Sequence, residues 1–323
     1  MTSPKRHHFL PITYQNGFLS DDGFIWVYEK GAGEPREQKP KNTGVISNYY
    51  KVTMPDGAQD SSLETDILSP IDSLWKPLYD KLHSADPRLN QEEKDAFLLF
   101  MTFMYLRTPR TRKANNELAL KSGILVIKDS AQSPEMLKKT YEVLRHQGKI
   151  PEEYTMEDMK EMIMNVDKDF KVTFNDDIVL ECLLKLFPVI FTLLKNMYAV
   201  FVCSGKSQHF ITSDNPVVPF VRFPDGQALF GAGFGDENVE ISFPISPTIC
   251  AFFFHHKRNP PSLEETNHRT AFCSDKEIYS FCFEKWIVEL ATEYEYTKSM
   301  AKVDDEELKK MLVEQGALKN TQK

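Results

Sequence analysis

The sequence lacks the motifs that mark several large classes of enzyme. No two cysteines form a C-x-x-C pair, so the sequence has no paired-cysteine zinc site. It also has no G-x-S-x-G or H-E-x-x-H motif, the signatures of serine hydrolases and zinc metalloproteases. The cysteines stand in apolar or strand-like surroundings, which indicates small buried thiols in a reducing compartment. They are Cys182, Cys203, Cys250, Cys273 and Cys282.

Long uncharged hydrophobic runs are also missing. The first eight residues contain no apolar segment of the kind found in signal peptides. The most apolar stretch, residues 178–202, carries Glu181, Lys185 and Lys195 as well as Pro188, and therefore favours a buried helix over a membrane span. We therefore expect a cytoplasmic protein with no membrane partner.

An excess of positive charge is absent as well. The net charge is -8 over 323 residues, which argues against broad coating of nucleic acid but leaves room for a local basic patch. The glycine-rich stretch 231–235 lacks a following Gly-Lys-Ser/Thr and stands before a strand, so it is not predicted to be a phosphate-binding loop. With 41% hydrophobic residues, the chain is long enough for one large core or two fused cores.

What is present is a pattern of strands, then helices, then strands. Residues 24–28 and 45–54 have β-type composition, whereas the segment 69–198 has helical signals. In that segment Asn90 and Glu93 form a capping box, and the apolar helix after them is predicted to end before Pro109. Short β-type runs separated by turn residues follow: 200–203, 210–212, 217–221, 228–230, 239–243 and 248–254.

This order predicts an α+β fold. The N-terminal strands are too few for a sheet of their own, so we expect them to join C-terminal strands in an antiparallel or mixed sheet packed against the helical middle segment. Two C-terminal helices are expected, over residues 275–296 and 304–312. We expect a single domain over residues 1–323, made of N-terminal strands (5–60), a helical segment (69–198), a strand-rich segment (199–255) and C-terminal helices (275–316).

The main candidate site is the turn Ser213-Asp214-Asn215-Pro216. It lies between two apolar strands predicted within residues 209–220. A carboxylate here is suited to be a general base or a ligand of Mg²⁺ or Mn²⁺, with Asn215 and Ser213 as further polar groups of the site. The alternative is structural, because Asp and Asn before proline form turns by hydrogen-bonding nearby backbone.

Basic residues offer possible partners for that carboxylate. His8 is a candidate base or metal ligand, although adjacent side chains of an extended segment face opposite ways, so either His7 or His8 would face a given pocket. Arg107, with Arg110 and Arg112, is suited to bind phosphate, or it is a solvated helix end. A second carboxylate is not singled out among Glu29, Glu34 and Glu64.

Several separated phrases resemble one family. They are Arg6-His7-His8-Phe9-Leu10-Pro11, Phe24 to Lys30, Leu106 to Pro109, Phe210 to Val217, and Phe243 to Pro247. Together they are similar to the mostly bacterial group called domain of unknown function 4238, over residues 5 to 290. The resemblance implies one full-length domain and implies that His8, Arg107 and Asp214 belong to the same site, but it indicates no reaction.

Two functions follow as hypotheses. In the first, the protein is a metal-dependent hydrolase of phosphoesters, possibly a nuclease, with His8, Asp214 and Asn215 as catalytic residues. His8 and Asp214 would hold Mg or Mn, and Arg107 and Ser213 would bind a phosphate-bearing substrate or nucleic acid. Such a nuclease would fit a toxin or defence effector. In the second, the protein is a non-enzymatic binding protein and the turn at 213–216 is structural.

Overall fold

The computed structural model describes residues 6–31, 33–53, 59–60, 62–170, 172–173, 176–205, 207–222, 228–230, 233–294 and 305–314. Internal contacts divide the chain into two compact units. The larger unit contains Met1–Arg112 and Leu180–Ala301, and the smaller contains Lys113–Val179 and Lys302–Lys323. The single domain over residues 1–323 stays a prediction.

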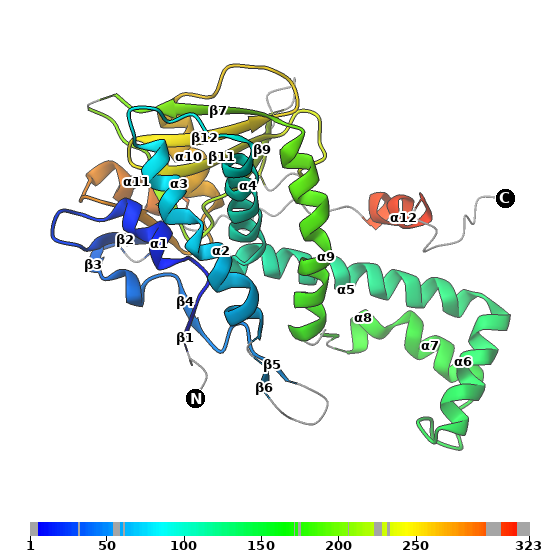
Figure 1. The fold of residues 1–323 in the computed structure, drawn as a ribbon. Coiled ribbons are helices and arrows are strands. Elements are labelled where there is room, and N and C mark those ends of the chain that lie inside the picture. The colour runs from blue at the N-terminus through cyan, green and yellow to red at the C-terminus, as the bar shows by residue number, and fades with distance from the viewer. Residues whose placement is uncertain are drawn as a thin grey trace. The chain divides into compact units, whose positions relative to one another are not determined.

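The larger unit is built around a five-stranded antiparallel sheet (Figure 1). Its strands come from the part of the chain where short aromatic and β-branched runs alternate with turns, as the sequence predicts. The order is β10-β9-β11-β12-β7, so β7 is an edge strand. The strands are β7 (Tyr198–Cys203), β9 (Val218–Arg222), β10 (Ala228–Phe230), β11 (Glu240–Ser246) and β12 (Ile249–Phe254).

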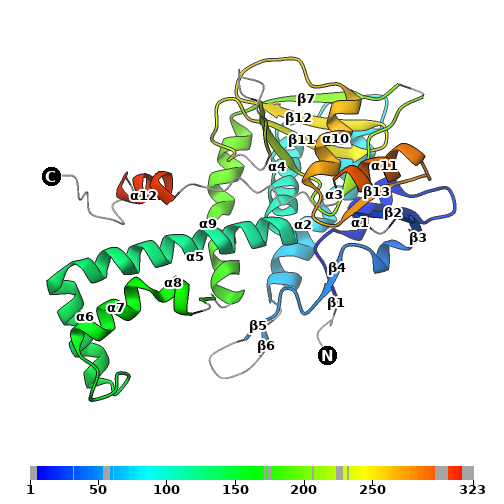
Figure 2. The same cartoon turned by 180° about the vertical axis from the view of Figure 1, so that it is seen from behind.

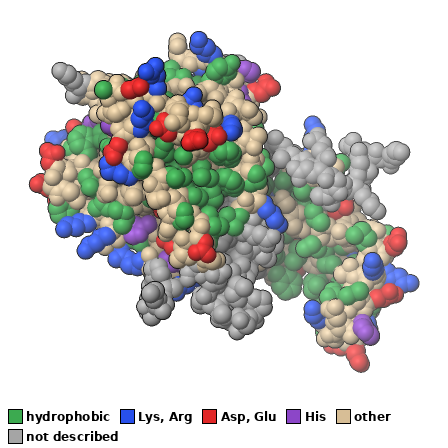
Figure 3. Space-filling view, in the orientation of Figure 1, with side chains coloured by type: hydrophobic (Ala, Val, Ile, Leu, Met, Phe, Trp, Pro, Cys, Tyr) green, Lys and Arg blue, Asp and Glu red, His purple; other side chains and the backbone are tan. Residues whose placement is uncertain are grey.

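Both faces of this sheet are covered. Alternate side chains of β12 point to opposite sides and show what packs on each face. Phe252 and Phe254 pack with Leu263 of α10 (Leu263–Cys273) on one face. Phe253 meets Phe97 of α4 (Gln91–Leu106) on the other, with ring centroids 6.4 Å apart. Figure 3 shows hydrophobic side chains gathered on the side of the molecule that carries α4.

A second sheet joins the two ends of the larger unit. Its order is β3-β2-β13-β8, and every neighbouring pair is antiparallel. N-terminal and C-terminal strands therefore share one sheet, which confirms the predicted α+β class. The strands are β2 (Ile25–Glu29), β3 (Arg36–Gln38), β8 (Thr212–Ser213) and β13 (Glu277–Ser280).

The helix predicted over residues 275–296 is wrong in its first part. Residues Glu277–Ser280 form β13, and the helix that follows, α11, is confined to Lys285–Glu293. The reason is tertiary, because β13 fills the gap between β2 and β8 and buries Ile278 and Tyr279 completely. Helix α10 was not predicted from the sequence. It packs against the second sheet through Ala271 and against the first through Leu263.

Helix α4 follows its sequence signals closely. Asn90 accepts a hydrogen bond from the backbone N–H of Glu93, whose side chain in turn accepts one from the N–H of Asn90, so the capping box is confirmed. The helix is buried on nearly all sides and ends at Leu106, before Pro109. Pro77 stands in the first turn of α3 (Trp75–Leu82), where its missing N–H leaves no helical bond unmade.

Smaller elements complete this unit. β1 (Arg6–His8) pairs with β4 (Val45–Ser47) in a separate two-stranded sheet. A π-helix, Leu63–Leu68, runs into α2 (Ser69–Ser73). The others are α1 (Ile12–Gln15), the 3₁₀ turns Asn16–Phe18 and Pro40–Asn42, and the pair β5 (Val52–Thr53) and β6 (Gln59–Asp60).

The smaller unit is helical, and its described core is small. Leu137, Met159 and Ala131 form a buried cluster, flanked by partly buried residues such as Tyr141 and Ile163. Its helices are α6 (Pro134–His146), α7 (Met156–Met164), α8 (Val166–Asp169) and α12 (Asp305–Glu314). Two long helices contribute residues to both units, α5 (Pro109–Gln132) and α9 (Asp176–Lys195). Among the described helices, none combines the length and hydrophobicity needed to cross a membrane.

Candidate functional site

Asp214 directly follows β8 and is almost fully buried. Its Oδ1 accepts a hydrogen bond from the backbone N–H of Asp275 at 2.8 Å. Its Oδ2 accepts two more, from Lys276 at 2.7 Å and Glu277 at 3.0 Å. The carboxylate thus holds the bend between α10 and β13, including the first residue of β13, through three consecutive backbone N–H groups.

The charge state of Asp214 reflects two opposing effects. Burial raises the pKa of its carboxyl to about 7, while the backbone N–H groups favour the charged form and act to lower it. Lys30 is the nearby cation, and its ammonium group donates to the carbonyls of Phe272 at 3.3 Å and Ser274 at 2.9 Å. Burial lowers the pKa of Lys30 to about 8 against the attraction of Asp214.

The two neighbours of Asp214 are also engaged in the turn. Ser213 is fully buried, and its Oγ accepts a hydrogen bond from the N–H of Asn215 at 3.1 Å. The Asn215 amide donates to the carbonyl of Cys273 at 2.9 Å, and its oxygen accepts from the Thr108 hydroxyl at 3.1 Å. These contacts tie the turn to the ends of α10 and α4. A catalytic or substrate-binding role for these residues stays a prediction.

Arg107 and His8 gather around a carboxylate that sequence reasoning did not select. The Arg107 guanidinium lies 2.8 Å from Asp72 of α2, and its side chain is only 3% exposed. Burial raises the pKa of Asp72, against the attraction of Arg107 and His8. Glu64, named from the sequence as one possible second carboxylate, is within reach of both Asp72 and Arg107, and burial raises its pKa as well.

The two adjacent histidines have different surroundings, as expected for an extended segment. His7 is fully buried and its Nδ1 accepts a hydrogen bond from the N–H of Tyr50 at 2.8 Å. His8 interacts with Asp72, and burial lowers its pKa, while the backbone carbonyls of Pro40 and Lys41 act to raise it. Within the described part of the chain, four buried polar groups here have no hydrogen-bond partner: His8 Nε2, the Tyr50 hydroxyl, Glu64 Oε2 and Arg107 Nε.

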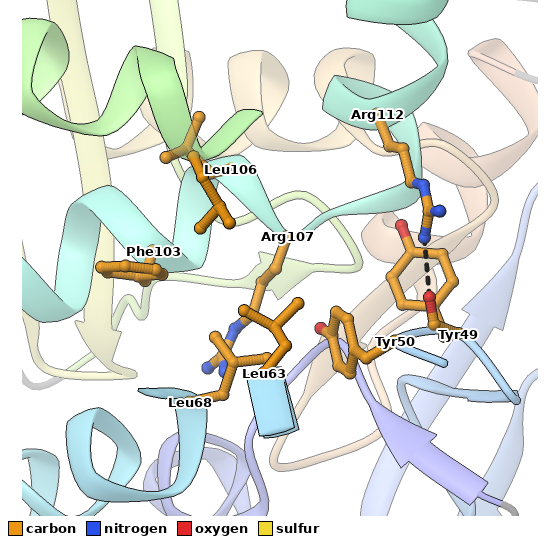
Figure 4. Close-up of a pocket in the computed structure, with 9 residues that line it drawn as sticks. Tyr49, Tyr50, Leu63, Leu68, Phe103, Leu106, Arg107 and Arg112 are labelled. Carbon is orange, nitrogen blue, oxygen red and sulfur yellow. Dashed lines mark hydrogen bonds between the residues drawn. The ribbon is translucent and has the colours of Figure 1, made fainter. Parts of the chain in front are cut away.

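The cavity beside Arg107 is small. It measures about 30 Å³, enough for one or two water molecules, and it is lined mainly by leucines and aromatic rings. Figure 4 shows the Arg107 side chain running between Leu63 and Leu68, while Arg112 points to Tyr49. Arg112 donates to the Tyr49 carbonyl at 2.7 Å and stacks on its ring.

The sequence-predicted residues therefore fall into two groups. His8 and Arg107 surround Asp72, whereas Ser213, Asp214 and Asn215 join β8 to α10 and β13. Among the described residues, the groups that bond to the Asp214 carboxylate are different from the groups that surround Asp72. Thr108 links the two groups, since it follows Arg107 in the chain and bonds to Asn215.

A larger pocket lies elsewhere in the same unit, between α10, α11 and the segment before β8. Its volume is about 540 Å³, which is sufficient for a small ligand. The helices α10 and α11 that form it lie side by side near β13 in Figure 2. Polar and aromatic side chains line it: His209, Asn267, His268, Trp286 and the carboxylates of Glu264, Glu284, Glu289 and Glu293.

At the wall of this pocket, three potential metal ligands converge. One ligand atom each from His209, Cys282 and Glu284 lies within 4.8 Å of the other two. His209 Nε2 is 4.0 Å from the Cys282 sulfur and 3.4 Å from the Ser280 hydroxyl. The sequence placed His209 at the start of a predicted strand and predicted a buried thiol at Cys282, which is instead partly exposed. The spacing Cys282-x-Glu284 was an available signal, because alternate residues of an extended segment share a face.

Comparison with known proteins identifies one family. Residues 6–311 match the family described as protein of unknown function, DUF4238. No curated protein and no solved structure matches the chain significantly.

Proposed function

The chain belongs to the DUF4238 family, and we propose that it is a metal-dependent hydrolase whose reaction takes place in the open pocket at His209. The observation that carries this proposal is the pocket of about 540 Å³ with an imidazole and a carboxylate, His209 and Glu284, adjacent in its wall. Hydrolysis needs an activated water, which such groups supply either by accepting its proton or by holding a metal ion.

The substrate class that we propose is a small phosphoester. Four carboxylates line the pocket, and their repulsion disfavours a long polyanion such as nucleic acid. A metal ion in the wall would offset this charge locally and bind one phosphate oxygen. The volume suits a ligand of small-molecule size, so a nuclease acting on duplexes is the less favoured form of the hydrolase.

In this proposal the residues first selected from the sequence act as supports. Asp214, Asn215 and Ser213 hold the turn that fixes β8, directly after the segment that carries His209. Arg107 and His8 hold the junction of α2 and α4 around Asp72. The alternative is that these residues take part in catalysis directly. Activity and stability measurements on variants distinguish a supporting role from a catalytic one.

A non-enzymatic binding protein is the second candidate. One observation supports it: three backbone N–H groups donate to the Asp214 carboxylate, as expected of a structural turn. The acidic pocket would then hold a small cationic ligand without reaction.

Hydrolysis assays decide between these functions. Purified full-length protein is tested with chromogenic phosphate monoesters and diesters and with labelled single- and double-stranded DNA and RNA, each with Zn²⁺, Mn²⁺ or Mg²⁺. We expect turnover of a small phosphoester, reduced about 100-fold or more in kcat/KM by Glu284→Gln. The matched control, Glu237→Gln, changes an exposed carboxylate outside the pocket and should retain activity.

Three results would contradict the proposal. The first is no turnover of any phosphoester with any of the three metals. The second is equal activity in Glu284→Gln and wild type. The third is a loss of activity in Asp214→Asn that is larger than its loss of folded protein, which would return the chemistry to the turn.

A further inference from the structure

We infer that His209, Cys282 and Glu284 form a binding site for one thiophilic divalent cation of the Zn²⁺ class. The site shares its location with the proposed hydrolase pocket and supplies the metal on which that proposed function rests. The metal site itself is nevertheless defined by its donor atoms and is measured without any substrate. Nitrogen, sulfur and oxygen donors converge here from two segments that are far apart in the sequence.

The donor set selects the type of metal. A cysteine sulfur and an imidazole are ligands that Zn²⁺ and Co²⁺ accept readily, whereas Mg²⁺ and Mn²⁺ prefer sites made of oxygen alone. The ion expected from the sequence was Mg or Mn, on the basis of Asp214 and His8. The ligands at His209 point to a softer ion.

The distances are close to those of an occupied site. In a tetrahedral zinc site with ordinary bond lengths, the nitrogen and sulfur ligand atoms are about 3.5 Å apart. His209 Nε2 and the Cys282 sulfur are 4.0 Å apart, and all three ligand atoms lie within 4.8 Å of one another. Side-chain adjustments of less than about 1 Å would therefore complete the geometry.

The backbone that carries the ligands is fixed by two buried polar side chains. The Tyr28 hydroxyl donates to the carbonyl of Cys282 at 3.0 Å and accepts from the N–H of Glu284 at 2.8 Å. The Asn267 amide donates to the carbonyl of His209 at 2.9 Å and accepts from the N–H of Ile211 at 3.1 Å. Both segments are thus held in place before any ion binds, which is the support that a metal site requires.

The surroundings of the imidazole limit its movement further. The His209 ring lies 4.9 Å from the ring of Phe281, edge to face, and 5.6 Å from Trp286. Three protein ligands leave a fourth coordination position open, and His209 and Glu284 both line the pocket. A cation at this site would thus be accessible to a water molecule or a small ligand, as in catalytic rather than structural zinc sites.

Cobalt substitution tests the inference directly. Full-length protein is stripped of metal by a chelator, dialysed and titrated with Co²⁺ and then with Zn²⁺. We expect one Co²⁺ per chain and a thiolate-to-cobalt charge-transfer band, which Zn²⁺ abolishes by displacement. Cys282→Ser should remove the band, and His209→Gln and Glu284→Gln should each weaken binding by about tenfold or more.

Matched variants serve as controls. Cys203→Ser changes an exposed thiol, and His256→Gln changes an exposed imidazole at the end of β12, and neither should alter the band or the affinity. Circular dichroism confirms that each variant is folded. Zn²⁺ should also raise the melting temperature of wild type and of the controls, but not that of Cys282→Ser, because an ion that binds only the folded state stabilises it.

Absence of Co²⁺ binding at micromolar metal, or a charge-transfer band that survives in Cys282→Ser, would overturn the inference. So would binding unchanged in Glu284→Gln and His209→Gln. Its failure is distinguishable from that of the proposed function. Metal binding without turnover leaves the site intact and removes the hydrolase. Turnover with Mg²⁺ or Mn²⁺ by protein that binds neither Co²⁺ nor Zn²⁺ removes the site and leaves the hydrolase.

Discussion

His209 and Asp214 stand at the two ends of one short stretch of chain, and their surroundings differ in almost every respect. The Asp214 carboxylate is buried, and backbone N–H groups of three consecutive residues occupy both of its oxygens. The His209 imidazole is partly exposed in the wall of an open pocket, beside a thiol and a carboxylate with which it makes only long contacts. Backbone N–H groups use the Asp214 carboxylate at one end of the stretch. At the other end, His209 Nε2 has only weak contacts among the described residues, to the Ser280 hydroxyl at 3.4 Å and the Cys282 sulfur at 4.0 Å.

The difference shows which polar residues are free for chemistry. A side chain whose hydrogen-bonding capacity is already used within the protein contributes to stability, and a ligand must displace those bonds before it can bind. Ligand atoms that make only weak or long contacts with one another but converge on one point are instead suited to an added ion or substrate. We therefore expect variants at Asp214 to act on folding and variants at the His209 end to act on binding.

The largest effect is expected from Asp214→Ala, which leaves three backbone N–H groups without their acceptor. A buried donor without a partner costs about 1–3 kcal/mol, so the free energy of unfolding should fall by roughly 3 kcal/mol or more. Urea denaturation at pH 5 measures it. Asp214→Asn, which keeps one acceptor oxygen, should lose less, and an Ala variant as stable as wild type would place Asp214 with the available groups.

The next effect is the pH dependence of that loss. Because the folded pKa of Asp214 is about 7 and the unfolded value is near 4, the folded state binds the proton more tightly. The stabilisation is then fully present below about pH 4 and is lost as the pH rises through 7. The stability gap between wild type and Asp214→Ala should narrow by roughly 2.5 kcal/mol from pH 5 to pH 8. A gap that widens over this range would show that the carboxylate is held in its charged form.

Asn267→Ala should have a smaller effect on stability, of about 1 to 2 kcal/mol, because it breaks two hydrogen bonds to the backbone at His209 and Ile211. It should also weaken Co²⁺ binding, since it releases the segment that carries the imidazole. Thermal melts and metal titrations of the same sample measure both. Unchanged metal affinity with lowered stability would restrict Asn267 to a structural role.

The smallest stability change is expected from Glu284→Gln, within about 0.5 kcal/mol, because the side chain is partly exposed and makes no buried ion pair among the described residues. The same variant should lose metal affinity and hydrolytic activity. A large destabilisation would show that Glu284 belongs with Asp214 as a structural residue, and the contrast between the two ends of the stretch would fail.

The sequence is informative where local chemistry determines structure. The capping box at Asn90, the end of α4 before Pro109 and the β-type runs after residue 199 are local signals, and each corresponds to an observed element. The strand at residues 277–280 was missed because nothing in its own sequence outweighs the helical pattern around it. It is a strand because β2 and β8 pair with its two edges.

The candidate sites show the same difference between local sequence signals and contacts that only the fold creates. The turn at 213–216 is recognisable from Asp and Asn before proline, but its partners at 275–277 are not, since they are brought there by the sheet. Asp72 and Glu64 meet Arg107 only through the packing of α2 and α4. His209 and Cys282 come together because β8 and β13 are neighbours, a contact that no spacing in the sequence encodes.

The pairing of β2 with β13 has a consequence for how the protein is made. Residues 25–29 are synthesised about 250 residues before the strand that pairs with them, 277–280, which is among the last parts of the larger unit to be synthesised. During most of translation, β2 therefore pairs with β3 along one edge, while the edge that later pairs with β13 stays open. Pairing over so long a sequence separation is slow, and the exposed edge favours association with other chains. The nascent chain should depend on chaperones until residue 280 is free to join the sheet.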